Sequence, residues 1–313
     1  MTATDAARPQ PTLAGRLDGT DLSLYAVTVF VWGTSWIALR MQLGVVAPEV
    51  SLVWRFALAA ALMFAWVAAK GERLRFSAAD HLRFAGLGVL IFSTNFVLFY
   101  YGGLTIPSGL LAVVFSLASV VNLALGALFL GQRIDGRIAA GGALGVLGVA
   151  AMFAPQILGA GFDRASLVGL GLCLGGTLSF CLGNMLSAAN QRRGVPVLPA
   201  NAWGMAYGVL FLTLVGLLRG HAFVVEPTLG YLGSLVWLAV TASVVAFACY
   251  LTLLGRIGAA RAGYATVLFP VVALAISTVV EGYRWTPLAV AGLVLVIAGN
   301  ILVLARPRAS SPK

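Results

Sequence analysis

The stretch GYATVLFPVVALAISTVVEG, residues 263–282, is long and apolar enough to cross a lipid bilayer as one helix. It nevertheless carries a proline in its middle and a carboxylate near its end, and both are costly inside hydrocarbon. At helical spacing Thr266, Pro270, Ser277 and Glu281 share one face, whereas the other faces carry valine, leucine, isoleucine and alanine. The stretch therefore predicts a membrane helix with lipid on one side and a polar cavity on the other.

The composition of the whole chain places this stretch in an integral membrane protein. Of the 313 residues, 60% are hydrophobic and only 10% are charged, and the mean hydropathy is +0.98. No water-soluble domain of this length tolerates such a surface, so we expect an all-α polytopic membrane protein that contacts the lipid bilayer. The formal net charge of +10 is typical of arginine-rich cytoplasmic loops, and we expect no nucleic-acid partner.

Cysteine and histidine usage indicates neither a metal site nor a catalytic site. Cys173, Cys181 and Cys249 all lie in apolar runs, their number is odd, and their spacing is not that of metal ligands. His81 and His221 fall in or beside loops on opposite sides of the membrane, and no acid–base pair occurs within one apolar run. We therefore expect no cofactor, no metal and no enzyme activity.

Charged residues divide the chain into apolar runs of about 20 residues, the length of one membrane-spanning helix. Ten spans are predicted, at residues 22–42, 50–69, 82–102, 108–130, 138–155, 167–190, 198–218, 231–254, 261–280 and 286–305. Residues 1–21 contain several prolines, glycines and aspartates and no apolar core, so we expect a disordered cytoplasmic tail. Residues 306–313 form the second predicted cytoplasmic tail.

The distribution of lysine and arginine gives an independent test of this count. With a cytoplasmic N-terminus, fifteen of the twenty basic residues fall on the inner side, and Arg55 falls within the second span. Only Arg40, Arg164, Arg219 and Arg284 then lie outside. A missed or invented helix would destroy this asymmetry, so we expect both termini to be cytoplasmic.

The ten spans also divide into two related sets of five. The run GALFLGQRIDGRIAAGGALGVLGVAAMF at 126–153 corresponds to STVVEGYRWTPLAVAGLVLVIAGNILVL at 277–304, each with a helix end, an arginine-containing turn and a glycine-spaced helix. Because five is odd, the second set enters the membrane upside down. We predict a first repeat at 22–155, an outer linker at 156–164 and an inverted second repeat at 165–305, with the substrate site near the midplane between them.

Aromatic and small polar residues recur on single faces of several spans. Asn184 is the sharpest case, because an amide inside a membrane needs a partner in protein or in a wet cavity. Helix-to-helix contacts and interfacial belts explain such residues equally well, and this alternative stays open for each of them. The candidate substrate-binding residues are Trp32, Ser35, Trp36, Asn95, Phe99, Tyr100, Tyr101, Asn122, Phe180, Asn184, Tyr250, Thr266, Pro270 and Ser277.

The predicted orientation moves Glu281 away from the membrane centre. The helix that contains it runs outward from Arg261, so Glu281 reaches the outer surface, where an arginine can pair with it. We predict an outer gate formed by Arg40, Arg55 and Glu281. No carboxylate is expected at mid-membrane, where proton-coupled carriers keep their relay, so transport is predicted to be facilitated, with proton coupling as the alternative.

The arrangement resembles a known family. Ten helices in two inverted halves, Trp32-Gly33 in the first span, Leu182-Gly183-Asn184 in the sixth, and Pro270 with Glu281-Gly282 in the ninth are similar to the drug/metabolite transporter superfamily, EamA-type branch. Within that branch the chain looks most like the YddG-type exporters of aromatic amino acids. The resemblance covers residues 22–305. It implies an exporter of the bacterial inner membrane that works by alternating access through a central cavity between the halves.

The first half departs from the family pattern. The fourth span of this branch often carries a proline and ends with a glutamate, and this chain has Ser119-Val120-Val121 and Gln132-Arg133 at those places. The leading hypothesis is an exporter of small apolar or aromatic amino acids that functions as a monomer. The alternatives are a multidrug or other metabolite exporter of the same fold, and then an integral-membrane enzyme.

Overall fold

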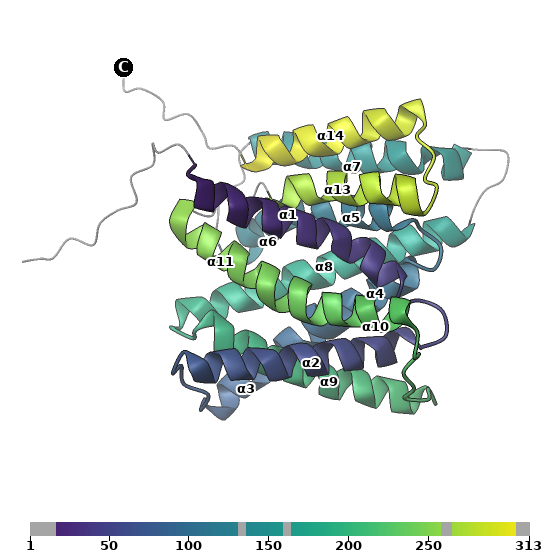
Figure 1. Ribbon diagram of the computed structural model, residues 1–313. Coiled ribbons are helices and arrows are strands. Elements are labelled where there is room, and N and C mark those ends of the chain that lie inside the picture. The colour runs from purple at the N-terminus through teal and green to yellow at the C-terminus, as the bar shows by residue number, and fades with distance from the viewer. Residues whose placement is uncertain (1–16, 131–135, 159–163, 258–264, 305–313) are drawn as a thin grey trace, which may run out of the picture.

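The computed structural model describes residues 17–130, 136–158, 164–257 and 265–304. Within these ranges every regular element is a helix, and the helices run side by side along one common direction (Figure 1). The start of α1 and the end of α14 lie at the same end of the bundle (Figure 1). We call this the termini end and the opposite one the far end.

Each predicted span lies on a helix or on a series of consecutive helices. The first half of the chain forms α1 (Gly19–Arg40), α2 (Pro48–Ala69), α3 (Ala78–Val89), η1 (Leu90–Thr94), α4 (Asn95–Gly102), α5 (Ser108–Ser116), α6 (Ala118–Leu130) and α7 (Gly136–Leu158). The second half forms α8 (Arg164–Arg192), α9 (Val197–Leu218), α10 (Leu229–Val236), η2 (Trp237–Val245), α11 (Ala246–Ile257), α13 (Ala265–Val280) and α14 (Pro287–Leu304). The predicted start of the ninth span, at residue 261, lies outside the described residues.

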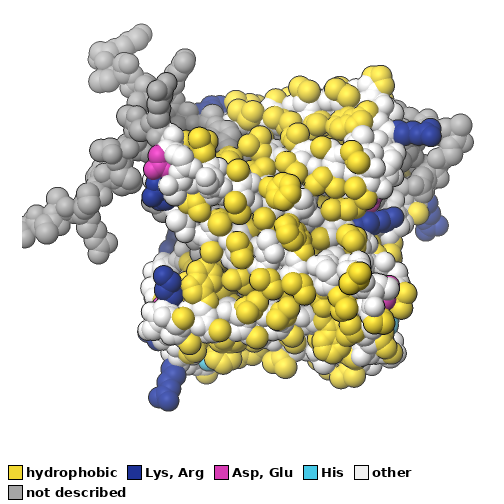
Figure 2. Space-filling view, in the orientation of Figure 1, with side chains coloured by type: hydrophobic (Ala, Val, Ile, Leu, Met, Phe, Trp, Pro, Cys, Tyr) yellow, Lys and Arg dark blue, Asp and Glu magenta, His cyan; other side chains and the backbone are white. Residues whose placement is uncertain are grey.

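The lateral surface of the bundle is apolar. Seven helices of the described ranges are long and apolar enough to cross a membrane, and shorter apolar helices lie at 139–154, 265–280 and 287–302. On the face shown in Figure 2, lysine and arginine lie toward the two ends, and the band between them is hydrophobic or uncharged. Large apolar side chains such as Leu128, Leu210 and Val279 are exposed on the bundle. This surface fits the lipid bilayer and not water.

Helices at the same place in the two halves pack against one another. Helix α2 contacts α9, α5 contacts α13, and α7 contacts α14. Helix α1, the first of its half, packs along α11 and α13 of the second half. Helix α8, the first of the second half, packs along α4 and α6 of the first half. The two halves therefore interlock, and helices from both surround the middle of the bundle.

The contact between α7 and α14 depends on glycine. A Cβ atom built on Gly148 would lie 2.5 Å from the carbonyl oxygen of Gly292, and one on Gly292 would lie equally close to the Gly148 oxygen. A Cβ atom built on Gly299 would likewise lie 2.5 Å from the carbonyl oxygen of Gly141. Such backbone-to-backbone approach is the way small residues join helices in lipid, where no hydrophobic driving force operates.

The quoted stretch 263–282 is a helix from Ala265 to Val280, and Pro270 lies inside it and is buried. Gly282, with a φ of +67°, ends it in a left-handed turn directly after Glu281. The helix at the same place in the first half has no proline, yet it breaks at Leu117, between α5 and α6. The helices at this place thus carry different irregularities, a proline inside a continuous α13 and a break between α5 and α6.

Two wide helical turns occupy matching places in the two halves. The π-helical segment η1 lies between α3 and α4, and η2 lies between α10 and α11. In each, a serine hydroxyl donates to the carbonyl five residues earlier, Ser93 to Gly88 and Ser243 to Leu238, both at 2.8 Å. A π segment turns the rest of its helix to a new direction, and such segments are frequent at functional sites. Accordingly α3 contacts α9, and α4 contacts α8.

Candidate functional site

Five aromatic rings from five helices meet in the middle of the bundle. The indole of Trp36 in α1 lies 5.3 Å from the ring of Phe99, 5.6 Å from Phe115 and 6.2 Å from Phe269, measured between ring centroids. Phe180 of α8 lies 4.9 Å from Phe115. These separations are those of favourable aromatic pairs. We call Trp36, Phe99, Phe115, Phe180 and Phe269 the aromatic cluster.

The aromatic cluster fills the place where an open cavity was expected. Trp36, Phe99 and Phe180 were predicted from the sequence, and the structure brings them together with Phe115 and Phe269. Phe269 was not predicted, because it precedes Pro270 by one residue and therefore lies off the polar face of its helix. The rings touch one another in this conformation, so a substrate that reaches the centre must displace them.

A second aromatic pair adjoins the aromatic cluster. The ring of Trp32 lies 5.0 Å from that of Tyr250 in α11, and Trp32 also packs against Phe269 and its apolar neighbours. The Ser35 hydroxyl donates to the carbonyl of Val31 in its own helix at 2.6 Å. Ser35 is therefore satisfied locally, whereas Trp32 and Tyr250 join α1 of the first half to α11 of the second.

Amides form a polar layer on the termini side of the rings. The Asn184 side-chain amide donates to the Asn122 oxygen at 3.3 Å, so these two predicted residues meet between α8 and α6. Asn300 of α14 is buried and hydrogen-bonds to Ser119 and to the carbonyl of Val296. Asn300 was missed because a lone asparagine near the end of an apolar run gives no periodic signal. The layer joins helices of both halves through hydrogen bonds.

Arg55, predicted to belong to the outer gate, is buried between helices of the bundle. Its side chain is 5% exposed, and its guanidinium carbon lies 4.4 Å from the centre of the Phe96 ring and 5.1 Å from that of Phe56. Buried cation–ring contacts contribute up to about 2 kcal/mol, whereas an ion removed from water loses several kcal/mol of hydration, on the order of twice that. Together the two rings offset much of this lost hydration, but neither ring supplies an opposite charge.

Unpartnered polar atoms accompany Arg55. Its Nε and the neighbouring Tyr100 hydroxyl are buried without a hydrogen-bond partner among the described residues. The Asn95 side-chain oxygen, at the start of the helix that carries Tyr100, is another such atom. Tyr100 is a polar neighbour of Arg55, although the geometry is not that of a full hydrogen bond. Buried polar atoms normally have partners, so those that lack one mark places where a ligand or water is expected.

A network at the far end holds Glu281. Its carboxylate accepts from the backbone N–H of Ser108 at 2.9 Å and from the hydroxyls of Ser108 and Ser277 at 2.5 and 2.6 Å. The Nε of Arg40 lies 3.5 Å from the other oxygen. The carboxylate thus caps the start of α5 and joins it to α1 and α13. Ser277, predicted to bind substrate, belongs to this network.

Replacing Glu281 by alanine is expected to lower the free energy of unfolding by about 2–4 kcal/mol, because three charge-assisted hydrogen bonds are removed together. Thermal unfolding of the purified protein in detergent measures this. Glu226 provides the matched control, because its recorded partner is Thr228 in an exposed loop at 3.1 Å. Glu226→Ala should unfold within about 0.5 kcal/mol of the native chain. Equal stability of the two variants would contradict the role assigned to Glu281.

A second far-end network surrounds Glu49, which is fully buried. Its carboxylate accepts from Arg219 and from the Tyr101 hydroxyl, and the His221 Nε2 lies 3.6 Å away. The Glu49 carboxylate raises the pKa of Arg219 above its ordinary value, which keeps the guanidinium charged. Tyr101 of α4, predicted to bind substrate, therefore contacts Glu49 at the start of α2 and Arg219 at the end of α9. No sequence pattern indicated which arginine would pair with Glu49.

The termini end has its own ion pairs. Arg256 of α11 contacts Asp21 at 2.5 Å and Asp18 at 2.7 Å, and the same two aspartates cap the start of α1. Helix α1 is thus tied to α11 at one end and, through Arg40, to α13 at the other. Both ends of α1 are closed against the second half in this conformation.

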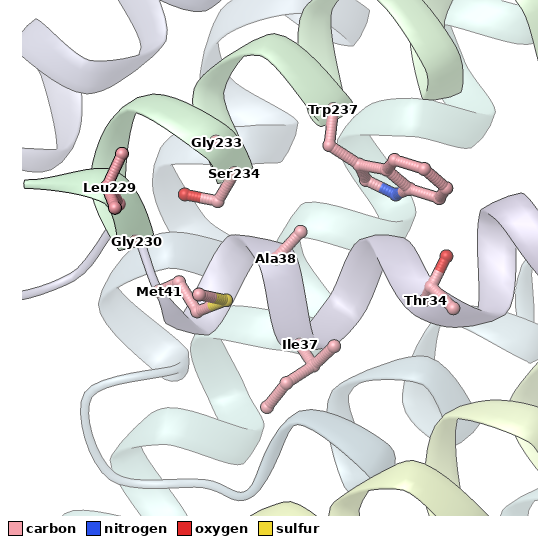
Figure 3. A pocket seen from close by; sticks show the side chains of 9 residues that line it. All are labelled: Thr34, Ile37, Ala38, Met41, Leu229, Gly230, Gly233, Ser234 and Trp237. Carbon is pink, nitrogen blue, oxygen red and sulfur yellow. The ribbon is translucent and has the colours of Figure 1, made fainter.

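Shallow hollows lie on both sides of α1. One, of about 250 Å³, lies between α1 and the segment α10–η2, where Ser234 and Trp237 face Thr34 and Ala38 (Figure 3). The other lies between α1 and α13 and is lined mostly by apolar side chains, among them Leu22, Val29 and Leu268. No residue of the aromatic cluster lines either hollow. Helix α1 therefore has free volume beside it on both flanks.

The remaining predicted residues lie on α13. Thr266 is half-buried one turn before Pro270, and Pro270 follows directly after Phe269 of the aromatic cluster. The structure thus brings most predicted residues toward the middle of the bundle and places Tyr101 and Ser277 in the two far-end networks. Which of them touch substrate stays a prediction.

Comparison with known proteins identifies the family. The model of the EamA-like transporter family matches residues 22–154 and again residues 167–305. The chain is 26% identical over 284 residues to a probable amino-acid metabolite efflux pump of Escherichia coli K12, which covers 88% of this chain and 92% of the relative. It is 26% identical over 280 residues to a probable terminal-alkyne amino-acid exporter of Streptantibioticus cattleyicolor, with 88% and 91% covered.

An uncharacterized transporter of Archaeoglobus fulgidus is also 26% identical, over 89% of this chain and 96% of its own length. A solved crystal structure shares the fold, with a TM-score of 0.65 and 17% identity over 90% of this chain and 96% of the other. The family match extends over most of the described helices and includes every residue of the aromatic cluster. The chain therefore belongs to the EamA-like transporter family.

Proposed function

We propose that this transporter exports small apolar and aromatic amino acids from the bacterial cytoplasm by alternating access. In this proposal, ten helices cross the inner membrane as two inverted repeats, at residues 22–155 and 165–305. Both termini are cytoplasmic, so the termini end is the inner end and the far end is the outer one. A monomer is sufficient, because both halves of the translocation path come from one chain.

The topology rests on several observations. Seven long and three shorter apolar helices account for ten crossings, and one family model matches each half separately. Helix α13 has 16 residues, which at 1.5 Å each span about 24 Å, most of a hydrocarbon layer about 30 Å thick. The described chain ends share one end of the bundle (Figure 1). The excess of lysine and arginine at that end supports its assignment to the cytoplasm.

The observation that carries the substrate class is the aromatic cluster. It lies between the halves, where transporters built from inverted repeats bind their substrates. A substrate with an aromatic or large apolar side chain can replace the ring-to-ring contacts that it disrupts, whereas a strongly polar substrate cannot. The amide layer of Asn122 and Asn184 beside the rings offers hydrogen bonds to polar groups of the same molecule. The names of the Escherichia coli and Streptantibioticus relatives support amino-acid export.

The positions of the carboxylates support facilitated transport. The acidic side chains of the described ranges lie toward the two bundle ends, with Glu49, Glu226 and Glu281 at the far end and Asp18, Asp21, Glu72 and Asp80 at the termini end. A proton-driven carrier is expected to hold a titratable relay near the midplane. We therefore propose export down the substrate gradient without proton coupling.

Purified protein in liposomes tests the proposal. Vesicles preloaded with unlabelled phenylalanine or leucine should accumulate labelled phenylalanine by saturable counterflow, and an imposed pH gradient alone should drive no uphill accumulation. A competition panel should rank phenylalanine and leucine above bulky organic cations and nucleotide sugars. Folded protein that shows no saturable amino-acid flux would contradict the proposal, and competition by bulky cations alone would favour a multidrug exporter of the same fold.

A further inference from the structure

We infer that Arg55, together with the Tyr100 hydroxyl, binds the carboxylate of the transported molecule inside the bundle. The inference rests on the proposed export of amino acids and deepens it, because it assigns a site to the charged end of the substrate. The site lies beside the aromatic cluster, which receives the apolar side chain.

Arg55 has no counter-ion in the described part of the chain. Its side chain is 5% exposed, and no carboxylate of the described residues forms an ion pair with it. The far-end carboxylates of the described residues have other partners: Glu49 pairs with Arg219, Glu281 with Arg40, and Glu226 accepts from the Thr228 hydroxyl. A buried charge inside a membrane protein that lacks a partner is by default a functional group, and here the missing partner is an anion.

Arg55 and Tyr100 have hydrogen-bond donors that lack an acceptor. Phe96 and Phe56 contact the guanidinium through their rings, and an aromatic ring leaves the N–H groups at the edge of the guanidinium plane available. Nε is buried and unpartnered, and so is the fully buried hydroxyl of Tyr100. A carboxylate can accept two parallel hydrogen bonds from such a fork, and it is the anion that an amino acid carries.

Arg55 lies close to the helix that contributes Phe99 to the aromatic cluster. Phe96 and Tyr100 lie one turn apart on α4 and face Arg55, and Phe99 of the same helix belongs to the aromatic cluster. One turn before Arg55 on α2, the Ser51 hydroxyl lies 3.0 Å from the Tyr231 hydroxyl of the second half. Helix α2 thus contacts α4 of its own half as well as α9 and α10 of the other half. Because α4 carries both Phe96 at the guanidinium and Phe99 in the aromatic cluster, we place the apolar side chain of the substrate toward the rings.

A purely structural role for Arg55 makes a different prediction about stability. If the arginine served only to join helices, its replacement by glutamine would lower the melting temperature. If it is held unpaired for a ligand, removal of the charge relieves a desolvation cost, and Arg55→Gln should melt at or above the temperature of the native chain. The exposed Arg284 provides the matched control, and Arg284→Gln should change neither stability nor flux.

The experiment compares phenylalanine with phenylalaninamide, which lacks the carboxylate, as competitors of labelled leucine flux in proteoliposomes. The native chain should prefer phenylalanine at least tenfold. Arg55→Gln should lose that preference through a weaker affinity for phenylalanine, while the affinity for the amide stays the same. Arg55→Lys keeps the charge without the planar fork and should retain part of the preference; it serves in place of the glutamine variant if that one does not fold. An equal loss for both competitors would overturn the inference.

A binding measurement separates this inference from the proposed function. Phenylacetate should raise the melting temperature of the native chain in detergent, and Arg55→Gln should abolish the shift. If amino acids are not transported but phenylacetate binds in an Arg55-dependent manner, the proposed substrate class fails and the carboxylate site stands. If amino acids are transported and neither the competition ratio nor the phenylacetate shift depends on Arg55, the carboxylate site is wrong and the proposed function stands.

Discussion

Leucine in place of Gly148 is expected to separate α7 from α14 and to reduce the free energy of unfolding by about 3 kcal/mol or more. A Cβ atom at this position would lie 2.5 Å from the Gly292 carbonyl oxygen and 2.8 Å from the Val296 backbone nitrogen. Both are backbone atoms of a helix, so they cannot rotate away as a flexible side chain would. Overpacking commonly costs about 1–3 kcal/mol even where neighbours can adjust, and leucine adds three further carbons.

Thermal unfolding and size-exclusion profiles in detergent measure this effect. Gly171 of α8 gives a matched control, because a Cβ atom there would meet no heavy atom within 4 Å. Gly171→Leu places an apolar side chain on an exposed face of its helix and should unfold within about 1 kcal/mol of the native chain. A Gly148→Leu protein that is monodisperse and as stable as the Gly171 control would show that the two helices do not depend on close approach.

Alanine in place of Trp36 is expected to lower the ratio kcat/KM for phenylalanine flux at least about fivefold. Trp36 makes three of the ring contacts in the aromatic cluster, and each such pair contributes about 0.5–1.5 kcal/mol. A substrate ring that takes over even two of them gains about 1–3 kcal/mol, and a tenfold change in affinity corresponds to about 1.4 kcal/mol. Most of the loss should therefore appear as a higher KM.

Trp36→Phe and Trp285→Ala complete this experiment. Phenylalanine at position 36 keeps an aromatic ring and should retain flux within about threefold, because the smaller ring weakens the interaction with substrate by only about 0.5 kcal/mol, the lower end for one ring pair. Trp285 lies at the far end, half-exposed, and its Nε1 donates to Thr278. Its replacement should leave KM unchanged. If Trp36→Ala transports phenylalanine normally while Trp285→Ala does not, the substrate does not pass the aromatic cluster.

The helical architecture was largely predictable because lipid permits few alternatives. Every backbone polar group must be paired within hydrocarbon, so a run of about 20 apolar residues can only be a helix, and charges mark where it ends. The glycine-spaced helix in the run 126–153 contains Gly141 and Gly145, and backbone atoms of both lie close to Gly299 of α14. The spacing did not reveal which helix would be the partner, because small residues allow contact without specifying it.

The candidate site was less predictable, for two physical reasons. Phe115 and Phe269 differ from lipid-facing phenylalanines only in what surrounds them, and that is decided by how the two halves pack. The ion pairs depend on loops that bring distant residues together, as Glu49 meets Arg219 across 170 positions. Arg55 was foreseen as unusual because a charge within an apolar run is costly. Its aromatic surroundings followed only from the packing of α4 against α2.

The paired π segments bear on the origin of the chain. Ser93 and Ser243 stand 150 positions apart, close to the separation of the matching runs 126–153 and 277–304, and each closes the same five-residue hydrogen bond. A wide turn of this kind adds one residue to an otherwise regular helix. Two independent insertions at equivalent positions are a less economical history than one insertion copied by gene duplication. The ancestral unit that the family model matches twice in this chain then already had this wide turn before it was duplicated.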